Sequence, residues 1–336
     1  MTQHTWLNDP YLALGAQVRL RRNVDGLPFR PRLQKAEALR LLHRAEDASK
    51  RASGAEMVLV PLQDLSPDCR QALVAQGLIS RDMERKNPCG LIWGRDKELE
   101  LLVNGEEHLT IQAQGEAPDL EPLLKKAMDL ETLLEESLDF SYDEEWGYLT
   151  SCHTNVGTGM RASVMLHLPA ITALRAVEKL VSETNRLGVT VRGVYGEGSQ
   201  AEGDLYQLSN RITLGVNERE TLDRLKEVIQ SVISEEERLL KYWYDANPVA
   251  FEDKIQRAWA TLQSARLMSG AEFLKFYSLC RTGIVLGLLS GSLDTLDNLF
   301  AQTRPASIAA REGKALEPVE RDAIRANMCR EALCKR

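Results

Sequence analysis

The sequence predicts an α+β protein, in which an antiparallel sheet flanked by helices is followed by a small all-helical domain. Strand patterns succeed one another across short turns, as around Asn104 and Gly105, which is typical of antiparallel pairs. Helical patterns fall at irregular intervals between the strands rather than after each one. After Asn247 and Pro248 the strand patterns stop, so we expect one domain over 1–245 and a second over 249–336.

Hydrophobic periodicity places the elements of the first domain. Helical spacing of apolar residues predicts helices over 32–53, 66–78, 118–139, 171–188 and 217–241. Apolar runs bounded by turn residues predict strands over 55–62, 89–94, 98–115, 147–152, 189–198 and 204–215. Ser66 and Pro67 are expected to start the second helix, and Gly188 to end the fourth. The strand pattern of 98–115 is expected to fold back around Asn104 and Gly105.

The second domain has a different pattern. Helical periodicity fills 249–299, and its many apolar side chains predict a small core of its own. A less regular segment rich in small residues is expected over 304–318, followed by a final helix from about 318.

Composition and charge limit the function. Hydrophobic residues make up 43% of the chain and charged ones 27%, the usual balance of a soluble globular protein. A net charge of −7 argues against binding to nucleic acid or to an anionic membrane through overall charge. No stretch is long and apolar enough to span a membrane, and the N-terminus lacks a secretory pattern, so we expect a cytoplasmic protein.

The cysteines do not predict a metal site. Six are present, none in a CxxC pair, and the five histidines do not cluster near them. Such a distribution argues against zinc and favours free thiols in a reducing compartment.

Three polar loops, at 104–108, 151–161 and 192–199, follow or join strands and can converge at one end of a sheet. They supply carboxylates, a thiol and arginines: Glu106, Glu107, Glu197, Cys152, Arg161 and Arg192. Arginine matches phosphate oxygens, and carboxylates can hold and deprotonate a cationic nitrogen. Neither a P-loop nor a Rossmann glycine motif is present. Residue type alone leaves simpler alternatives open: solvated glutamates, a packed cysteine, and an Arg161 that caps a helix.

Four segments resemble the ATP:guanido phosphotransferases, or phosphagen kinases, and most closely their bacterial protein-arginine kinase branch. "SCHTNVGTGMRASVMLHLPA" at 151–170 resembles the cysteine loop of the family. "LLVNGEEHLTIQ" resembles the segment Asn-Glu-Glu-Asp-His-Leu/Ile-Arg, and "VRGVYGEGS" resembles Arg-Gly-x-Tyr-Gly-Glu. "QVRLRRN" resembles the start Ser-Ser-Arg-Ile-Arg-Leu-Ala-Arg-Asn. The tail segments "SARLMSGAEFLKFYSLCRTGIVLGLL" and "ERDAIRA" resemble the extra domain of the protein-arginine kinases.

The resemblance implies a phosphagen-kinase-like catalytic domain that uses ATP and Mg²⁺ to phosphorylate arginine side chains of proteins. It implies that Glu106 and Glu197 orient the substrate guanidinium, with Glu106 as the base, and that Cys152 tunes the electrostatics beside it. The residues implied in nucleotide binding are Arg19, Arg161, Ala162, Ser163, Val164, Met165, Arg192, Gly193, Val194, Tyr195, Gly196 and Glu197. No metal-binding side chains are predicted.

The chain also departs from the family segments. Gln17 and Thr110 stand where the family has phosphate-binding arginines, and Gly77 where it has a histidine near the adenine pocket. Gly105 replaces a glutamate, and His153 replaces the proline after the cysteine. Two lost arginines leave an alternative open: a degenerate kinase that binds phosphoarginine proteins as an adaptor or scaffold. A purely structural role is a weaker third possibility.

The second domain carries its own motif. Arg321, Asp322, Arg325 and Ala326 match the Arg-Asp-x-x-Arg-Ala motif of protein-arginine kinases, which implies a phosphoarginine-binding pocket. The simpler interpretation is a solvated helix with ordinary salt bridges. The resemblance further implies a homodimer or higher oligomer through this domain, a zinc-binding activator protein, and a Clp-type AAA+ unfoldase as partner.

Overall fold

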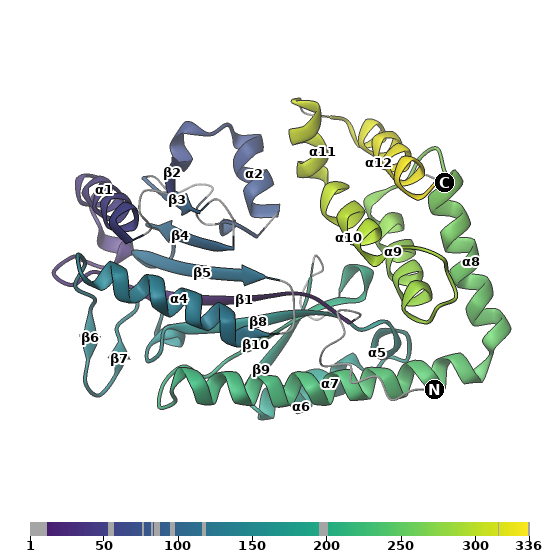
Figure 1. The fold of residues 1–336 in the computed structure, drawn as a ribbon, viewed down its shortest axis with the longest axis horizontal. Coiled ribbons are helices and arrows are strands. Elements are labelled where there is room, and N and C mark those ends of the chain that lie inside the picture. The colour runs from purple at the N-terminus through teal and green to yellow at the C-terminus, as the bar shows by residue number, and fades with distance from the viewer. Residues whose placement is uncertain are drawn as a thin grey trace. The chain divides into compact units, whose positions relative to one another are not determined.

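The computed structural model describes residues 12–52, 57–75, 77–81, 83, 88–94, 98–115, 119–194, 201–314 and 316–334. Within them the chain forms two compact units (Figure 1). Unit 1 comprises Met1–Leu14, Met165–Leu208 and Val228–Arg336, and unit 2 comprises Gly15–Val164 and Ser209–Glu227. This division differs from the predicted one, and the domain boundary near residue 245 stays a prediction.

Unit 2 is built on strands hydrogen-bonded in the order β2-β3-β4-β5-β1-β8. The strands are, in chain order, β1 (Ala13–Arg22), β2 (Val58–Pro61), β3 (Gly90–Trp93), β4 (Leu99–Val103), β5 (Leu109–Gly115) and β8 (Met160–His167). Neighbouring strands from β2 to β1 are antiparallel. The helices are α1 (Lys35–Ala52), α2 (Pro67–Ala75), α4 (Leu120–Glu135) and the first turns of α7 (Glu218–Ala246). A separate hairpin joins β6 (Tyr142–Asp143) to β7 (Gly147–Tyr148).

The register of the central strands gives the sheet one apolar and one partly polar face. Leu20 lies opposite Ile111, which lies opposite Leu101, and all three side chains are fully buried. Helix α4 packs on β5, and α1 packs on α4 (Figure 1). Because successive residues of a strand point to opposite faces, Arg19 and Arg21 share the face that Leu20 does not use. This face carries the candidate site.

Unit 1 continues with strands in the order β8-β10-β9, where β9 is Val189–Gly193 and β10 is Leu205–Asn210. Its helices are α5 (Pro169–Ala173), α6 (Val177–Arg186), the later turns of α7, α8 (Pro248–Ser264), α9 (Gly270–Val285), α10 (Leu293–Gln302), α11 (Pro305–Glu312) and α12 (Pro318–Leu333). A continuous core joins them. It includes Phe251, Ile255, Phe273, Tyr277 and Phe300, and the rings of the last two stack with centroids 4.9 Å apart.

Several expected local features are confirmed. Strands β4 and β5 form the hairpin predicted around Asn104, which adopts a positive φ of 62°. The Ser66 hydroxyl accepts the backbone N–H of Cys69 at 3.2 Å, as expected of an N-cap. Helix α6 ends just before Gly188, whose φ is 78°. The α+β class is therefore confirmed.

Three expectations were wrong. The helix expected over 171–188 breaks between α5 and α6, where Arg175 has a φ of 58° and the N–H of Ala176 bonds back to Ile171 O. The strand expected over 147–152 is limited to Gly147–Tyr148, and the amides of Ser151 and Cys152 bond to the Glu107 carboxylate instead of to a strand. The irregular segment expected over 304–318 contains helix α11, which begins at Pro305, buries Ile308 and ends at Gly313 in a left-handed conformation.

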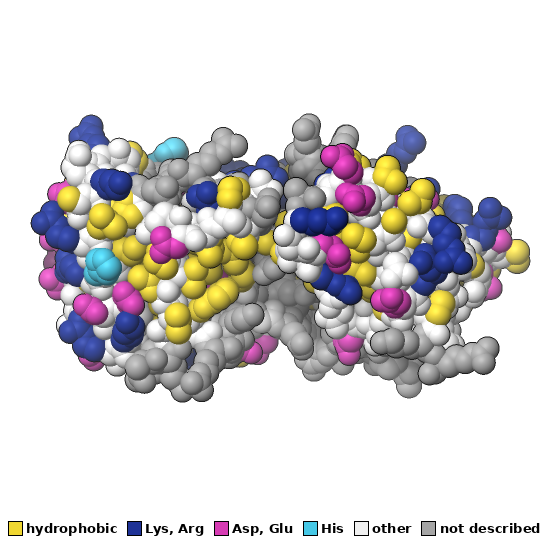
Figure 2. All heavy atoms as spheres, turned by 90° about the horizontal axis from the view of Figure 1, so that it is seen from above, with side chains coloured by type: hydrophobic (Ala, Val, Ile, Leu, Met, Phe, Trp, Pro, Cys, Tyr) yellow, Lys and Arg dark blue, Asp and Glu magenta, His cyan; other side chains and the backbone are white. Residues whose placement is uncertain are grey.

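No described helix is long and apolar enough to cross a membrane. On the face drawn in Figure 2, Lys and Arg side chains are scattered among acidic and hydrophobic ones rather than joined in one continuous basic surface.

Candidate active site

A pocket of about 420 Å³ in unit 2 brings together two of the predicted catalytic residues. Glu106 comes from the β4–β5 turn, and Cys152 from the loop after β7. Arg30, Pro31 and Ser151 complete the lining. The Glu106 side chain is 48% exposed, so its carboxylate is accessible to a substrate. Cys152 is a free, half-buried thiol whose Sγ lies 3.0 Å from Thr154 Oγ1.

Glu107, the neighbour of Glu106, holds these segments together. Its side chain is fully buried, and its carboxylate accepts the backbone N–H of Ser151 at 2.7 Å and that of Cys152 at 3.3 Å. The same carboxylate accepts Asn23 Nδ2 at 2.7 Å. Bonds to an ionised acceptor are stronger than neutral ones, so Glu107 fixes the cysteine loop beside the β4–β5 turn. These bonds also take the amides of Ser151 and Cys152 away from strand pairing.

His108 fixes the segment that leads to Arg30. Its Nδ1 accepts the backbone N–H of Val24 at 3.0 Å, and its Nε2 lies 3.0 Å from Pro28 O. Burial lowers the pKa of His108, so the ring is neutral and its Nε2–H donates to the carbonyl. Arg30 then reaches the pocket with its Nε bonded to Asn104 O at 2.9 Å.

Arginines concentrate on the partly polar face of the sheet beside this pocket. Burial, followed by the charges of Arg21 and Arg161, lowers the pKa of the Arg19 guanidinium to about 10, while Glu100 and Glu106 act in the opposite direction. Arg21 Nε lies 3.4 Å from the Glu106 carboxylate. Three neighbouring guanidinium groups against two carboxylates leave an excess of positive charge, which is suited to an anionic ligand.

A cross-strand row of polar groups orients Arg19. Arg19 Nε donates to Gln112 Oε1 at 2.7 Å, and Gln112 Nε2 donates to Glu100 Oε2 at 2.8 Å. The three residues occupy neighbouring positions on β1, β5 and β4. Burial raises the pKa of Glu100 to about 7. Gln112 thus links Arg19 to Glu100, a carboxyl group whose pKa lies near neutral pH.

Arg22, in contrast, is structural. Its side chain is 1% exposed, its Nε lies 2.5 Å from Glu131 Oε1, and its guanidinium stacks over the Tyr148 ring at 3.4 Å. Its Nη1 also donates to Thr158 O at 3.0 Å. These contacts tie α4, β7 and the loop before β8 together.

The predicted nucleotide-binding run on β8 divides into two groups. Ala162 and Val164 have fully buried side chains, and Ser163 is 5% exposed. Arg161 is only half-buried, and its Nη1 lies 3.5 Å from Ser209 Oγ. Arg161 is therefore the residue of this run whose side chain is best placed to reach a ligand.

The remaining predicted nucleotide residues are not part of unit 2. Met165, Gly193 and Val194 belong to unit 1, as does Arg192, whose side chain is exposed at the end of β9. Tyr195, Gly196 and Glu197 lie outside the described residues.

The predicted phosphoarginine motif lies on α12. Arg325 is 2% exposed and donates to Met268 O at 2.7 Å, to Thr303 O at 3.1 Å and to Asp322 Oδ1 at 2.7 Å. Arg321 is half-buried, with its Nη1 bonded to Leu316 O at 2.7 Å. Ala326 is fully buried. The two guanidinium groups therefore differ: Arg325 joins α12 to neighbouring segments, while Arg321 is the more accessible.

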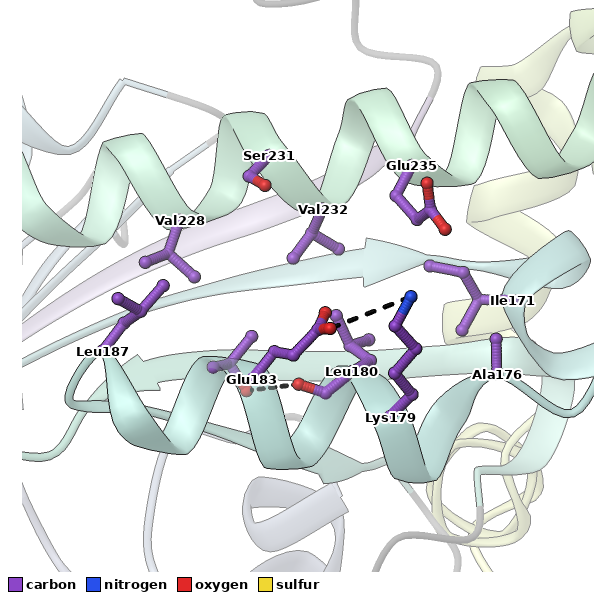
Figure 3. A pocket seen from close by; sticks show the side chains of 11 residues that line it. Ile171, Ala176, Lys179, Leu180, Glu183, Leu187, Val228, Ser231, Val232 and Glu235 are labelled. Atoms are coloured by element: carbon purple, nitrogen blue, oxygen red, sulfur yellow. Dashed lines mark hydrogen bonds and ion pairs between the residues drawn. The ribbon is translucent and has the colours of Figure 1, made fainter.

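Two further pockets lie within unit 1, and neither contains a predicted residue. The groove between α6 and α7 has apolar walls that include Leu180, Val228 and Val232, and the Lys179–Glu183 ion pair crosses its rim (Figure 3). Its volume of about 70 Å³ is too small for a nucleotide. A second pocket, of about 540 Å³, is lined by residues of α7, α8 and α9, including Trp243 and Arg257.

Comparisons with known proteins identify the family of the chain. Residues 41–239 match the family model of the ATP:guanido phosphotransferase C-terminal catalytic domain. Residues 248–336 match that of the protein-arginine kinase McsB C-terminal domain. The chain is a member of the protein-arginine kinase branch of the ATP:guanido phosphotransferase family.

Relatives of this ATP:guanido phosphotransferase support the assignment over nearly the whole chain. A protein-arginine kinase of Caldanaerobacter subterraneus subsp. tengcongensis is 38% identical over 332 residues, 98% of each chain. That of Bacillus subtilis is 35% identical and covers 96% of this chain and 90% of its own. Both proteins are named kinases, which confirms the expected enzyme class and gives no support to the alternative of a degenerate adaptor.

Solved structures support the fold. A lombricine kinase superposes with a TM-score of 0.61 at 21% identity and covers 69% of this chain and 68% of its own. The duplicated taurocyamine kinase from Schistosoma mansoni gives 0.63 at 22% identity, covering 76% of this chain and 39% of its own. The expected phosphagen-kinase fold is confirmed.

Three site residues were not predicted from the sequence. The sequence identifies Glu107 only as one carboxylate among several, because its role depends on amides 44 and 45 residues away. Arg30 follows no motif. Arg21 had a usable signal, since it lies two positions after Arg19 and a strand places such residues on one face.

Proposed function

We propose that this protein transfers the γ-phosphoryl group of ATP to arginine side chains of proteins. The observation that carries the proposal is that Glu106 and Cys152 line one pocket, beside the arginine cluster of Arg19, Arg21 and Arg161. A guanidinium needs a carboxylate, which the pocket supplies through Glu106, and a phosphoryl group needs arginines, of which Arg21 lies 3.4 Å from that carboxylate.

In the proposed reaction, Glu106 accepts a proton from the substrate guanidinium. The freed nitrogen lone pair forms the N–P bond to the γ-phosphorus, and the bond from phosphorus to the bridging oxygen breaks, with its electron pair leaving on ADP. The products are phosphoarginine, ADP and one proton. Such a transfer depends mainly on in-line positioning and on cations around the transferred group. Glu197 is proposed as the second guanidinium-binding carboxylate, and Cys152 as a polar neighbour of the same guanidinium.

From the family resemblance, Arg19, Arg161 and Arg192 are proposed to bind nucleotide phosphates together with the backbone of 162–165 and 193–197. No group of three or more His, Cys, Asp or Glu side chains that could hold a metal ion is found in the described part of the chain. Mg²⁺ is proposed to arrive bound to the ATP phosphates, the usual arrangement for this ion in phosphoryl transfer.

The two-domain organisation predicted from the sequence remains part of the proposal, and the two family-model matches lie on either side of residues 240–247. The helical region is proposed to form a homodimer and to bind phosphoarginine near Arg321 and Asp322. A cytoplasmic location, a role in stress response, a zinc-binding activator and a Clp-type unfoldase as partner are proposed from the family resemblance.

The test is transfer of label from ATP to an unfolded arginine-rich protein in the presence of Mg²⁺. N–P bonds are acid-labile, so phosphoarginine is distinguished from hydroxyl-linked phosphate by its loss in acid. We expect acid-labile label with the wild type and almost none with Glu106→Gln. Equal label in both proteins, or none in either, would exclude the proposal.

A further inference from the structure

Arg21 is a buried residue of the site with an unused donor. It lies on β1 with 9% of its surface exposed, and its Nε faces the Glu106 carboxylate at 3.4 Å. Its Nη1 is buried and has no hydrogen-bond partner within the described residues. Leaving a buried donor unpaired is unfavourable, so native proteins rarely do it without a functional reason.

The position of Arg21 in the sheet suggests what that reason is. In the β1–β5 register, Arg21 lies directly opposite Thr110. Side chains of directly opposite residues start from Cβ atoms only about 5 Å apart on the same face of a sheet. Thr110 is where the family segment has an arginine, and Arg21 is where the family start Arg-Leu-Ala-Arg-Asn has an alanine. The chain therefore carries a cross-strand exchange, with the guanidinium moved from β5 to β1.

We propose that Arg21 is a substrate-contacting residue that takes the place of the arginine missing at position 110 and binds the phosphoryl group during its transfer. This proposal rests on the proposed function. Arg21 supplies the cation at the point where Glu106 removes the guanidinium proton. As the N–P bond forms and the P–O bond to ADP breaks, the Arg21 guanidinium donates to an oxygen of the transferred group and keeps its own protons.

The surrounding charges favour this role over a purely structural one. Burial is the main cause of the lowered pKa of Arg19, and repulsion by the nearby charge of Arg21 is the next. Arg22, the neighbour of Arg21 in sequence, shows what a structural arginine looks like in this fold, with a buried carboxylate, two carbonyls and an aromatic ring as partners. Arg21 has one half-exposed carboxylate and an orphan donor. An incoming anion satisfies both the donor and the excess charge.

The first test moves the guanidinium back to β5. Arg21→Ala is expected to lower kcat about 100-fold, the typical effect of losing one transition-state donor, with the KM for ATP changed less than about threefold. The double variant Arg21→Ala with Thr110→Arg is expected to have a kcat at least about tenfold higher than that of Arg21→Ala alone. Arg44→Ala, at an exposed position on α1, is the control and should behave as wild type. A kcat of Arg21→Ala within threefold of wild type, or a double variant no faster than Arg21→Ala, overturns the assignment.

The second test does not depend on turnover and detects a folding defect. Nitrate is a planar anion that resembles the transferred phosphoryl group in the transition state. It should therefore strengthen the binding of MgADP in the presence of an arginine peptide. Calorimetry is expected to show this increment in the wild type and in Glu106→Gln, and to show its loss in Arg21→Ala while MgADP alone binds as before. A wild type without the increment, or an Arg21→Ala that keeps it, refutes the role of Arg21 whatever the activity. An inactive wild type that shows the increment refutes the proposed function alone.

Discussion

The Glu107 carboxylate accepts the backbone N–H of Ser151 at 2.7 Å, so one buried acid holds the loop that carries Cys152. We predict that Glu107→Gln lowers the free energy of unfolding by about 1–3 kcal/mol. The glutamine amide has one acceptor oxygen, whereas the two carboxylate oxygens of Glu107 accept from Asn23, Ser151 and Cys152. Turnover should fall about tenfold as the loop loosens. Urea unfolding and the transfer assay measure the two effects.

Glu106→Gln is the matched comparison for that variant. Its carboxylate is half-exposed and pairs only with Arg21 among the described residues, so the free energy of unfolding should change by less than about 0.5 kcal/mol. Turnover should fall by about 10²–10⁴-fold, the usual contribution of a general base. If Glu106→Gln proved as destabilising as Glu107→Gln while remaining active, the roles given to these neighbours would have to be exchanged.

Glu100 predicts a specific pH dependence of stability. Burial raises the pKa of this carboxyl group to about 7 in the folded protein, above its unfolded value of about 4.5. Between these values the folded state binds the extra proton, so the contribution of Glu100 to stability falls as pH rises from about 4.5 to about 7 and is constant above. Glu100→Gln removes this slope. Compared with wild type, the variant should gain about 2–3 kcal/mol at pH 8 relative to pH 5.

The groups that face Glu100 are Gln112, Gln114 and, through Gln112, Arg19. Only Arg19 among them is charged, and it stays protonated throughout this range, so the slope belongs to Glu100. Chemical unfolding at both pH values gives the difference directly. An unchanged slope in Glu100→Gln would show that the carboxyl group is already ionised at pH 5.

Arg325 and Arg321 should respond differently to removal, although they belong to one motif. Arg325→Ala leaves Asp322 and the carbonyls of Met268 and Thr303 without their donor in a buried setting, so it should cost about 3–5 kcal/mol. Arg321→Ala should cost less than about 1 kcal/mol, because it loses one bond at a half-buried position.

The binding experiment on α12 follows from that difference. Arg321→Ala is folded and is therefore the clean probe of phosphoarginine binding, which we expect to weaken at least about tenfold. Calorimetry with free phosphoarginine measures it, with Arg311→Ala on α11 as an exposed control. Undiminished affinity in Arg321→Ala would leave the motif a structural one.

Elements with strong periodicity or clear end signals were predictable from the sequence. The β4–β5 hairpin, the cap at Ser66 and the stop at Gly188 each depend on residues close together in the chain. Helix α11 also had such signals, Pro305 at its start and Gly313 after its end, which were outweighed by the small residues between them.

Contacts between segments far apart in the chain could not be predicted from the sequence. In the first turn of α5, where N–H groups have no helical acceptor, those of Ala170 and Ile171 bond to the buried carboxylate of Glu236, 65 residues or more away. The amides that Glu107 takes from 151–152 are a similar case. In the candidate site, motif resemblance found Glu106 and Cys152. The unpaired donor of Arg21 required the strand register.

The pairing of Arg21 with Thr110 also bears on how an enzyme is judged inactive. Compared position by position with the family segments, the chain has Thr110 in place of a phosphate-binding arginine and Arg21 in place of an alanine. Arg21 and Thr110 face each other across the two strands, so the pair still supplies one guanidinium, as the family segments do. In this chain it is attached to β1 instead of β5. Pseudoenzymes proposed from missing residues are best checked against every residue that shares a cross-strand neighbour with the gap.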